Sequence, residues 1–115
     1  MSTLYSDRVK ESSTTTGTGN FILSGAIAGF KSFNETIGTG NLCYYCIQTT
    51  DLSAWEVGIG TLINSTTLSR NSILSSSNNN LIVNFGVGSK EVFSTLPSKF
   101  FQDIVNEYMA LSIAL

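Results

Sequence analysis

The two cysteines, Cys43 and Cys46, are the side chains of this sequence with the most chemistry available to them. A Cys-x-x-Cys spacing can form a redox pair or supply half of a zinc site. Zinc needs about four nitrogen or sulfur ligands, and the sequence holds no His and no further Cys. Both cysteines lie in the aromatic run 42–47, which is typical of a strand, where residues three apart point to opposite faces. We therefore predict small apolar core residues, with neither a bound metal nor a disulfide.

Carboxylates are the other candidates for catalysis, because the absence of His excludes Ser-His-Asp and Cys-His triads. Two carboxylates facing one cleft could hydrolyse a glycosidic bond. The acidic residues are spread along the chain without a close pair: Asp7, Glu11, Glu35, Asp51, Glu56, Glu91, Asp103 and Glu107. Trp55 beside Glu56 is the one arrangement that resembles a sugar site, and the simpler interpretation is a core Trp beside an outward-facing Glu. The sequence thus predicts no catalytic residues and no enzyme.

Glycine pairs raise the possibility of a nucleotide site. A phosphate-binding loop needs Gly-x4-Gly-Lys-Ser/Thr before a helix, and the segment from Gly25 to Gly29 breaks this spacing. The segment from Gly86 to Lys90 lacks the upstream glycine and leads into a predicted strand. These glycines fit turns and bulges better, so no cofactor-binding residue is predicted.

Composition limits the partners of this chain. Only 12% of the 115 residues are charged, against about 25% in a typical domain, and the net charge is −2. The six basic residues form no cluster in the sequence, which argues against nucleic-acid binding. No secretion signal and no stretch long enough for a membrane span is visible, so we expect synthesis in a cytoplasm and no membrane association. A polar but weakly charged surface suits a protein packed against neighbours.

The elements that must position these residues are mostly strands. Short segments of β-branched and aromatic residues recur at about ten-residue intervals and are separated by Gly, Ser and Asn turns. The strands are expected at 8–16, 21–24, 29–33, 42–49, 54–62, 67–74, 81–85 and 90–96. Residues 81–85 and 90–96 are expected to form a hairpin, and 8–16 an edge strand open to a neighbouring chain. The fold class is therefore all-β, an antiparallel sandwich or barrel of about seven or eight short strands with a C-terminal α-helix.

The C-terminal segment follows a different period. Apolar residues at 101, 104, 105, 108, 111 and 115 have helical spacing, and Ser98 after Pro97 can cap the helix. We expect residues 1–97 to form the β module, with residues 1–7 as a loose or partner-dependent arm. Residues 98–115 form an amphipathic helix for packing within the subunit or for oligomerisation.

Several segments, read in order, resemble a β module that recurs in structural proteins of tailed-bacteriophage particles. The segments are 7–19 (Asp-Arg-Val-Lys-Glu-Ser-Ser-Thr-Thr-Thr-Gly-Thr-Gly), 29–33 (Gly-Phe-Lys-Ser-Phe), 45–47 (Tyr-Cys-Ile), 55–61 (Trp-Glu-Val-Gly-Ile-Gly-Thr), 68–78 (Leu-Ser-Arg-Asn-Ser-Ile-Leu-Ser-Ser-Ser-Asn) and 88–93 (Gly-Ser-Lys-Glu-Val-Phe). The resemblance covers about residues 5–97 and is carried by the ordered set. It implies a component of the virion, often oligomeric and without enzymatic activity. It assigns no role to any single residue.

The resemblance leaves three functions to separate. The first is a capsid decoration or cement protein, which the short chain favours. The second is a tail or neck adaptor or short fibre attachment protein, and the third is a module that binds host-surface glycans. The expected partners are other virion proteins, either the major capsid protein or tail and neck proteins, together with further copies of the chain. The expected location is the virion, assembled in the host cytoplasm.

Overall fold

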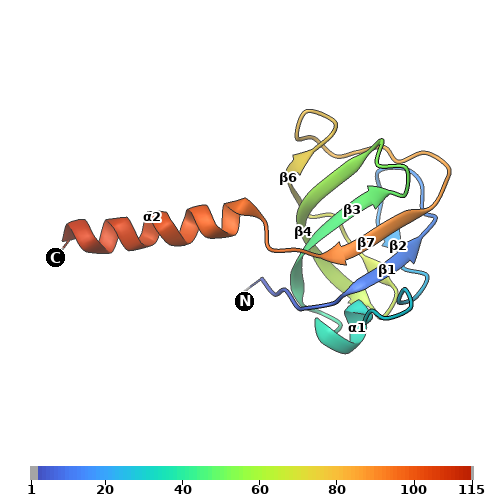
Figure 1. The fold of residues 1–115 in the computed structure, drawn as a ribbon, viewed down its shortest axis with the longest axis horizontal. Helices are drawn as coiled ribbons and strands as arrows, with labels where there is room; N and C mark the ends of the chain where they lie inside the picture. Colours follow the sequence, from blue (N-terminus) through green and yellow to red (C-terminus); the bar gives the residue numbers. More distant parts are fainter. Residues whose placement is uncertain (1–2, 115) are drawn as a thin grey trace.

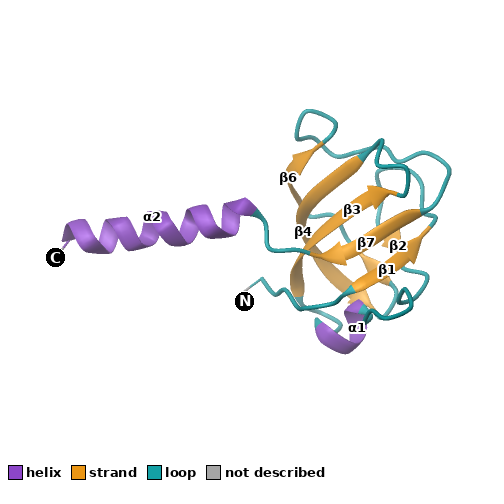
Figure 2. Cartoon of the chain, viewed as in Figure 1, coloured by secondary structure: helices purple, strands orange, loops and turns teal. Residues whose placement is uncertain are grey.

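The computed structural model describes residues 3–114, in which a curled antiparallel sheet is followed by a long C-terminal helix (Figures 1 and 2). The elements in chain order are β1 (Lys10–Ser13), β2 (Phe21–Ile22), α1 (Phe33–Thr36), β3 (Leu42–Thr49), β4 (Trp55–Asn64), β5 (Thr67–Leu68), β6 (Ser72–Ser76), β7 (Lys90–Ser94) and α2 (Ser98–Ala114). We call residues 3–97 the β body. The predicted fold class, mostly β with a C-terminal helix, is confirmed.

The β3–β4 hairpin is the centre of the sheet. Its strands pair from Leu42 with Thr61 to Gln48 with Trp55, as the alternating pattern predicts. Across the sheet the strand order is β1-β7-β3-β4-β5-β2, and β6 pairs separately with β4. Asp51 holds the hairpin turn, because its Oδ1 accepts hydrogen bonds from the Thr49 hydroxyl (2.7 Å) and from the Ser53 amide (3.0 Å) and hydroxyl (2.7 Å). These hydrogen bonds lower the pKa of Asp51 to about 2.

The outer edge of β1 is covered by its own chain. Segment 24–31 runs beside it and forms backbone hydrogen bonds of 2.8–3.1 Å, in which Lys10 N–H donates to Lys31, Ser12 N–H to Gly25, Ser24 N–H to Ser12 and Ile27 N–H to Lys10. The Ser13 hydroxyl also donates to the carbonyl of Ile22 in β2 (2.7 Å), so the two ends of the strand order meet. The predicted edge strand at 8–16 is present as the shorter β1, which is an end strand of the order. The expectation that this edge is open to a neighbouring chain was wrong, because its backbone groups already have partners.

The hydrophobic core fills the inside of the curled sheet. Its fully buried members come from β2, β3, β4, β5 and β7, from α1 and from the loop before β7: Phe21, Phe33, Cys43, Tyr45, Ile47, Leu62, Leu68, Phe85 and Val92. Phe21 and Phe85 meet edge to face with their ring centroids 5.3 Å apart. This packing joins β2, one end of the strand order, to the loop between β6 and β7.

Three predicted strands differ in the structure. Residues 29–33 are not a strand: Ser32 caps the short helix α1, and its hydroxyl accepts from Glu35 N–H while the Glu35 carboxylate accepts from Ser32 N–H. Residues 81–85 are irregular, so the predicted hairpin with 90–96 does not form and β7 pairs instead with β1 and β3. The segment 67–74 is divided between β5 and β6, and Arg70 lies between them.

The two terminal segments meet at one end of the β body. Residues near the N-terminus are hydrogen-bonded to β3, with Leu4 N–H donating to Leu42 and Tyr44 N–H donating to Leu4, both at 2.9 Å. Phe100, near the start of α2, packs edge to face against Tyr5 and Tyr44 at 5.6 and 5.9 Å. Beyond Phe100, α2 extends away from the β body (Figure 1). Within the described residues, no helix has both the length and the apolar character needed to cross a membrane.

Candidate functional site

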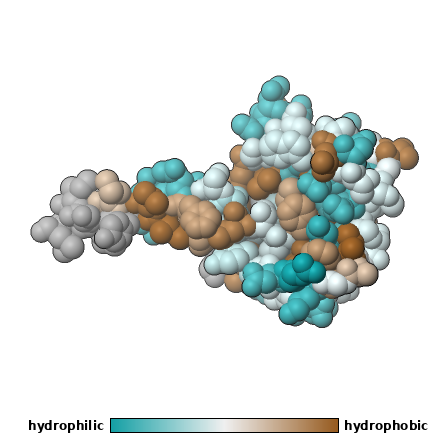
Figure 3. All heavy atoms as spheres, viewed as in Figure 1, coloured by the Kyte–Doolittle hydropathy of each residue, from teal (hydrophilic) through white to brown (hydrophobic). Residues whose placement is uncertain are grey.

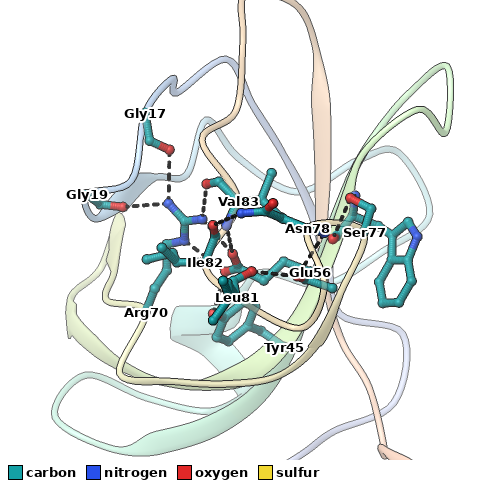
Figure 4. A network of polar contacts seen from close by, with 12 residues as sticks. Gly17, Gly19, Tyr45, Glu56, Arg70, Ser77, Asn78, Leu81, Ile82 and Val83 are labelled. Atoms are coloured by element: carbon teal, nitrogen blue, oxygen red, sulfur yellow. Dashed lines mark hydrogen bonds and ion pairs between the residues drawn. The ribbon is translucent and has the colours of Figure 1, made fainter.

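The largest polar cluster lies inside the β body and centres on Glu56 of β4 and Arg70 (Figure 4). The two side chains are 0% and 1% exposed and form a bidentate ion pair, with Arg70 Nη2 to Glu56 Oε1 at 2.6 Å and Nε to Oε2 at 2.8 Å. The Glu56 carboxylate also accepts from the Tyr45 hydroxyl (2.7 Å) and from Val83 N–H (2.9 Å). Burial and the nearby Glu56 charge raise the pKa of Tyr45, so its hydroxyl remains a donor.

Every N–H of the Arg70 guanidinium has an acceptor. Besides Glu56, the group donates to the carbonyls of Gly17 (3.1 Å), Gly19 (3.2 Å) and Val83 (2.6 Å). Its carbon lies 5.2 and 5.4 Å from the ring centroids of Phe21 and Phe85. Since both charged groups are fully paired and out of contact with solvent, the cluster fastens three segments together and has no free group for substrate.

The sugar-site interpretation of Trp55 and Glu56 fails on this geometry. The two residues point to opposite faces of β4, with Trp55 37% exposed and Glu56 completely buried. The simpler interpretation, a core Trp with an outward Glu, was also wrong, because β4 turns its Glu56, Gly58 and Gly60 face inward. Glycine at two inward positions lets the backbones of Ser69 and Ser72 approach closely, since a Cβ at Gly60 would overlap the Ser69 carbonyl. Sequence reasoning missed Arg70, although glycines alternating with a Glu in one strand could have indicated a close backbone approach.

Two further charged side chains are buried. Glu11 accepts one backbone hydrogen bond on each carboxylate oxygen, from Gly25 (3.1 Å) and Phe33 (2.8 Å), and so ties β1 to segment 25–33. Lys90 donates to the carbonyl of Gly86, and burial lowers its pKa. Both side chains therefore connect segments of the backbone. Among the described residues, neither forms a hydrogen bond with another titratable side chain.

Cys43 and Cys46 are both buried and unbonded, as predicted for core residues. Cys43 lies on the inner face of β3, while Cys46 pairs with Val57 and Phe93 on the other side. Burial raises the pKa of Cys43 to about 12, and burial together with the Glu56 charge raises that of Cys46 to about 11. Neither thiol therefore has the thiolate character of a redox centre at neutral pH. Among the described residues, no group of three or more His, Cys, Asp or Glu is placed to hold a metal ion.

Two shallow pockets lie on the β body. One of about 200 Å³ lies between the Asp51 turn and loop 86–89, and its one carboxylate, Asp51, is held by Thr49 and Ser53. The other, of about 230 Å³, lies where the linker before α2 crosses β4 and β6, and its lining is Val57, Leu74, Ser75, Thr95, Pro97, Ser98 and Lys99. The first lining has no basic side chain beside Asp51. The second brings Ser75 and Ser98 near Lys99, but the Lys99 ammonium is exposed and paired with Asp103 at 3.2 Å.

The most conspicuous surface is hydrophobic and belongs to α2. Phe101, Ile104, Val105 and Met109 are each about half exposed, at 54%, 48%, 51% and 56%. Figure 3 shows this hydrophobic surface continuing along the helix away from the β body. The Lys99–Asp103 ion pair lies on the helix surface and is itself more than half exposed. A surface of this kind is suited to contact with another protein.

No protein-family model, no curated protein and no solved structure matches this chain. The candidate site is therefore defined by geometry alone. The buried polar groups of the β body have hydrogen-bond partners. Apolar side chains are exposed in a row on α2, and the β body also exposes some, among them Leu52, Leu81 and Val87. The apolar face of α2 is the feature of this geometry that is best suited to an interaction with another protein.

Proposed function

We propose that this chain is a non-enzymatic structural protein of a tailed-bacteriophage particle, and that it decorates the capsid. The observation that carries the proposal is the contrast between a β body whose buried charges all have partners and a helix whose apolar side chains remain exposed. The ordered segments that resemble a virion β module supply the class of particle. In this role α2 contacts protein, and the β body forms the outward-facing unit.

The low charge of the chain supports the same function. Of the six cations, Arg70 and Lys90 are buried and Lys99 is paired with Asp103, which leaves three basic residues for the surface of the β body. A decoration protein is present in many copies side by side, where strong surface charge would create repulsion between neighbours. Many weak contacts in a regular array add up through multivalency.

Purified particles of the phage that encodes the chain provide the test. Mass spectrometry of washed particles should detect the chain, and antibody–gold labelling should place gold over the head. A protein that is absent from the particles would contradict any structural role. Labelling after mild detergent treatment serves as the control for copies covered by other proteins.

A second function, adaptor at the neck or tail, is favoured by one observation. The helix leaves the β body as an isolated rod, a shape suited to docking into a ring or sleeve of other subunits (Figure 2). Gold at the neck or tail in the same experiment would support the adaptor and contradict the decoration role. The glycan-binding alternative gains no such support, because Glu56 points away from the exposed Trp55.

A further inference from the structure

The helix α2 carries apolar side chains that the β body does not cover. Its contact with the β body is made at Phe100, which packs on Tyr5 and Tyr44. In the turn that follows, Phe101, Ile104 and Val105 are about half exposed, with Phe101 directly after Phe100. Most of the stability of a helix of this length comes from packing an apolar face, because helix propensity alone leaves such segments marginal in water. The helix therefore needs a partner along its length.

The sequence spacing indicates what kind of partner fits. Apolar residues recur at positions 101, 104, 108, 111 and 115, alternately three and four residues apart. This is the heptad spacing with which helices pack side by side, where 101 and 108 are a positions and 104 and 111 are d positions. A partner that matches a 3.5-residue repeat is another helix with the same repeat.

The a and d positions together form the packing seam of the helix, and the charged residues of the helix lie outside it. Lys99 and Asp103 occupy outer heptad positions and pair with each other at 3.2 Å. Glu107 falls at a g position, where a parallel copy in register presents the e position, Ser112. A second copy of the same helix therefore adds no like-charge contact along the seam, which makes the helix complementary to itself.

We propose that α2 assembles with α2 of other copies of this chain into a parallel bundle of at least three helices, with Phe101 and Ile104 facing the bundle axis. The inference deepens the proposed function by naming the partner of α2, and in part it rests on that function. A parallel arrangement places every β body at the same end, as a protein that stands on a particle surface requires.

The exposed area favours three or more copies over two. Phe101, Ile104, Val105 and Met109 are the exposed apolar side chains that the structure describes on α2. With roughly 200 Å² each when free and about half of it exposed, they offer roughly 400 Å² per copy and roughly 800 Å² per pair. A stable two-partner interface buries at least about 1,200 Å². Val105 and Met109 are also apolar and lie beside the a and d positions. Ile104 at d differs from the Leu at d that favours two-stranded coiled coils. In a larger bundle each helix contacts two neighbours, so that residues beside the a and d positions are buried as well.

The first test measures mass with two matched variants of the full chain. Ile104→Asp places a carboxylate on the seam, and Asn106→Asp places the same carboxylate on the opposite side of the same turn. Light scattering after gel filtration should give the wild type and Asn106→Asp a mass at least three times the 12.4 kDa of one chain. Ile104→Asp should fall to the mass of one chain. A wild type that is monomeric or dimeric would overturn the proposal.

A second test fixes the orientation of the helices. A cysteine at Ile104→Cys lies next to its own copy in a parallel bundle and should form an interchain disulfide under mild oxidation. Asn106→Cys, on the outside, should crosslink at least tenfold less, and the parent chain with its buried Cys43 and Cys46 is the blank. Equal crosslinking at both positions, or an oligomer without crosslinking at Ile104→Cys, would overturn the parallel seam.

The two proposals fail separately. The mass and crosslinking experiments use the purified chain and do not depend on where it is found. A bundle that forms in solution although the chain is absent from particles would retain this inference and remove the virion role. A chain that is found on particles but is monomeric in solution would do the reverse.

Discussion

The β body and α2 distribute polar and apolar groups in opposite ways. Inside the β body, the Glu56 and Arg70 side chains are no more than 1% exposed, and both have full hydrogen-bond complements. On α2, Phe101 and Ile104 are about half exposed, while Lys99 and Asp103 pair with each other on the surface. The β body satisfies its buried polar groups within the chain, and in our proposal α2 is completed by contact with other copies. The proposal therefore assigns folding and assembly to separate parts of the sequence.

Breaking the interior network is expected to have the largest effect. Arg70→Met leaves the Glu56 carboxylate buried without its cation and removes the donors to Gly17 and Gly19. We expect a loss of about 3–5 kcal/mol in the free energy of unfolding, as for other broken buried pairs. Urea titration followed by the fluorescence of Trp55, the one Trp, measures it. Lys99→Met, which removes an exposed pair, is the control and should change stability by less than about 1 kcal/mol.

Filling the close approach beside β4 should come second. Gly60→Ala places a methyl group against the Ser69 carbonyl, so strands β4 and β5 must separate locally. We expect a loss of about 1–3 kcal/mol, seen as a lower Tm. Gly86→Ala is the matched control, because a Cβ there meets no heavy atom within 4 Å. An equal loss for both variants would mean that the inward glycines are not needed for packing.

Removing the helix should have a smaller effect on stability and a large one on assembly. Deletion of residues 98–115 removes the two aromatic contacts of Phe100, worth about 1–2 kcal/mol in total. The remaining β body should therefore still unfold cooperatively, and it should be monomeric. If the deletion left the oligomeric state unchanged, or abolished cooperative unfolding, the division between a complete and an incomplete region would be wrong.

The smallest effect should come from the exposed Asp51 turn. The pKa of Asp51 is lowered from 3.8 to about 2 in the folded chain, so its contribution is fully present above pH 4. As the pH falls from about 4 to about 2 the carboxylate takes up a proton and that contribution is lost. Asp51→Asn should flatten the dependence of Tm on pH in this interval and leave it unchanged near pH 7. An identical acid profile for both proteins would contradict the role of the turn.

The sequence allowed prediction of elements with strong local signals. The β3–β4 hairpin follows from alternation and a polar turn, and α2 follows from its apolar period. The prediction put the wrong face of β4 inward, because the burial of Glu56 depends on Arg70, which lies 14 residues away; the alternating Gly58 and Gly60 were the one local signal for it. Residues 81–85 have the composition of a strand, yet the backbone groups of Val83 form hydrogen bonds with the Glu56 and Arg70 side chains instead of with a neighbouring strand. The capping box of Ser32 and Glu35 was a local signal for α1. The prediction gave more weight to the two nearby Phe residues, which favour a strand.

The way the curled sheet is fastened has a consequence for folding kinetics. Arg70 bonds to carbonyls 51 and 53 residues earlier in the chain, at Gly19 and Gly17, and to one 13 residues later, at Val83. Contacts between such distant positions form only after large loops have closed, so chains dominated by them fold in about milliseconds to seconds. We expect the hydrogen bonds of the Arg70 guanidinium to form late in folding, once β5 and the loop before β7 have met. Until then the curled sheet of each newly made chain is not closed, while the C-terminal helix, whose contacts are local in sequence, can already form.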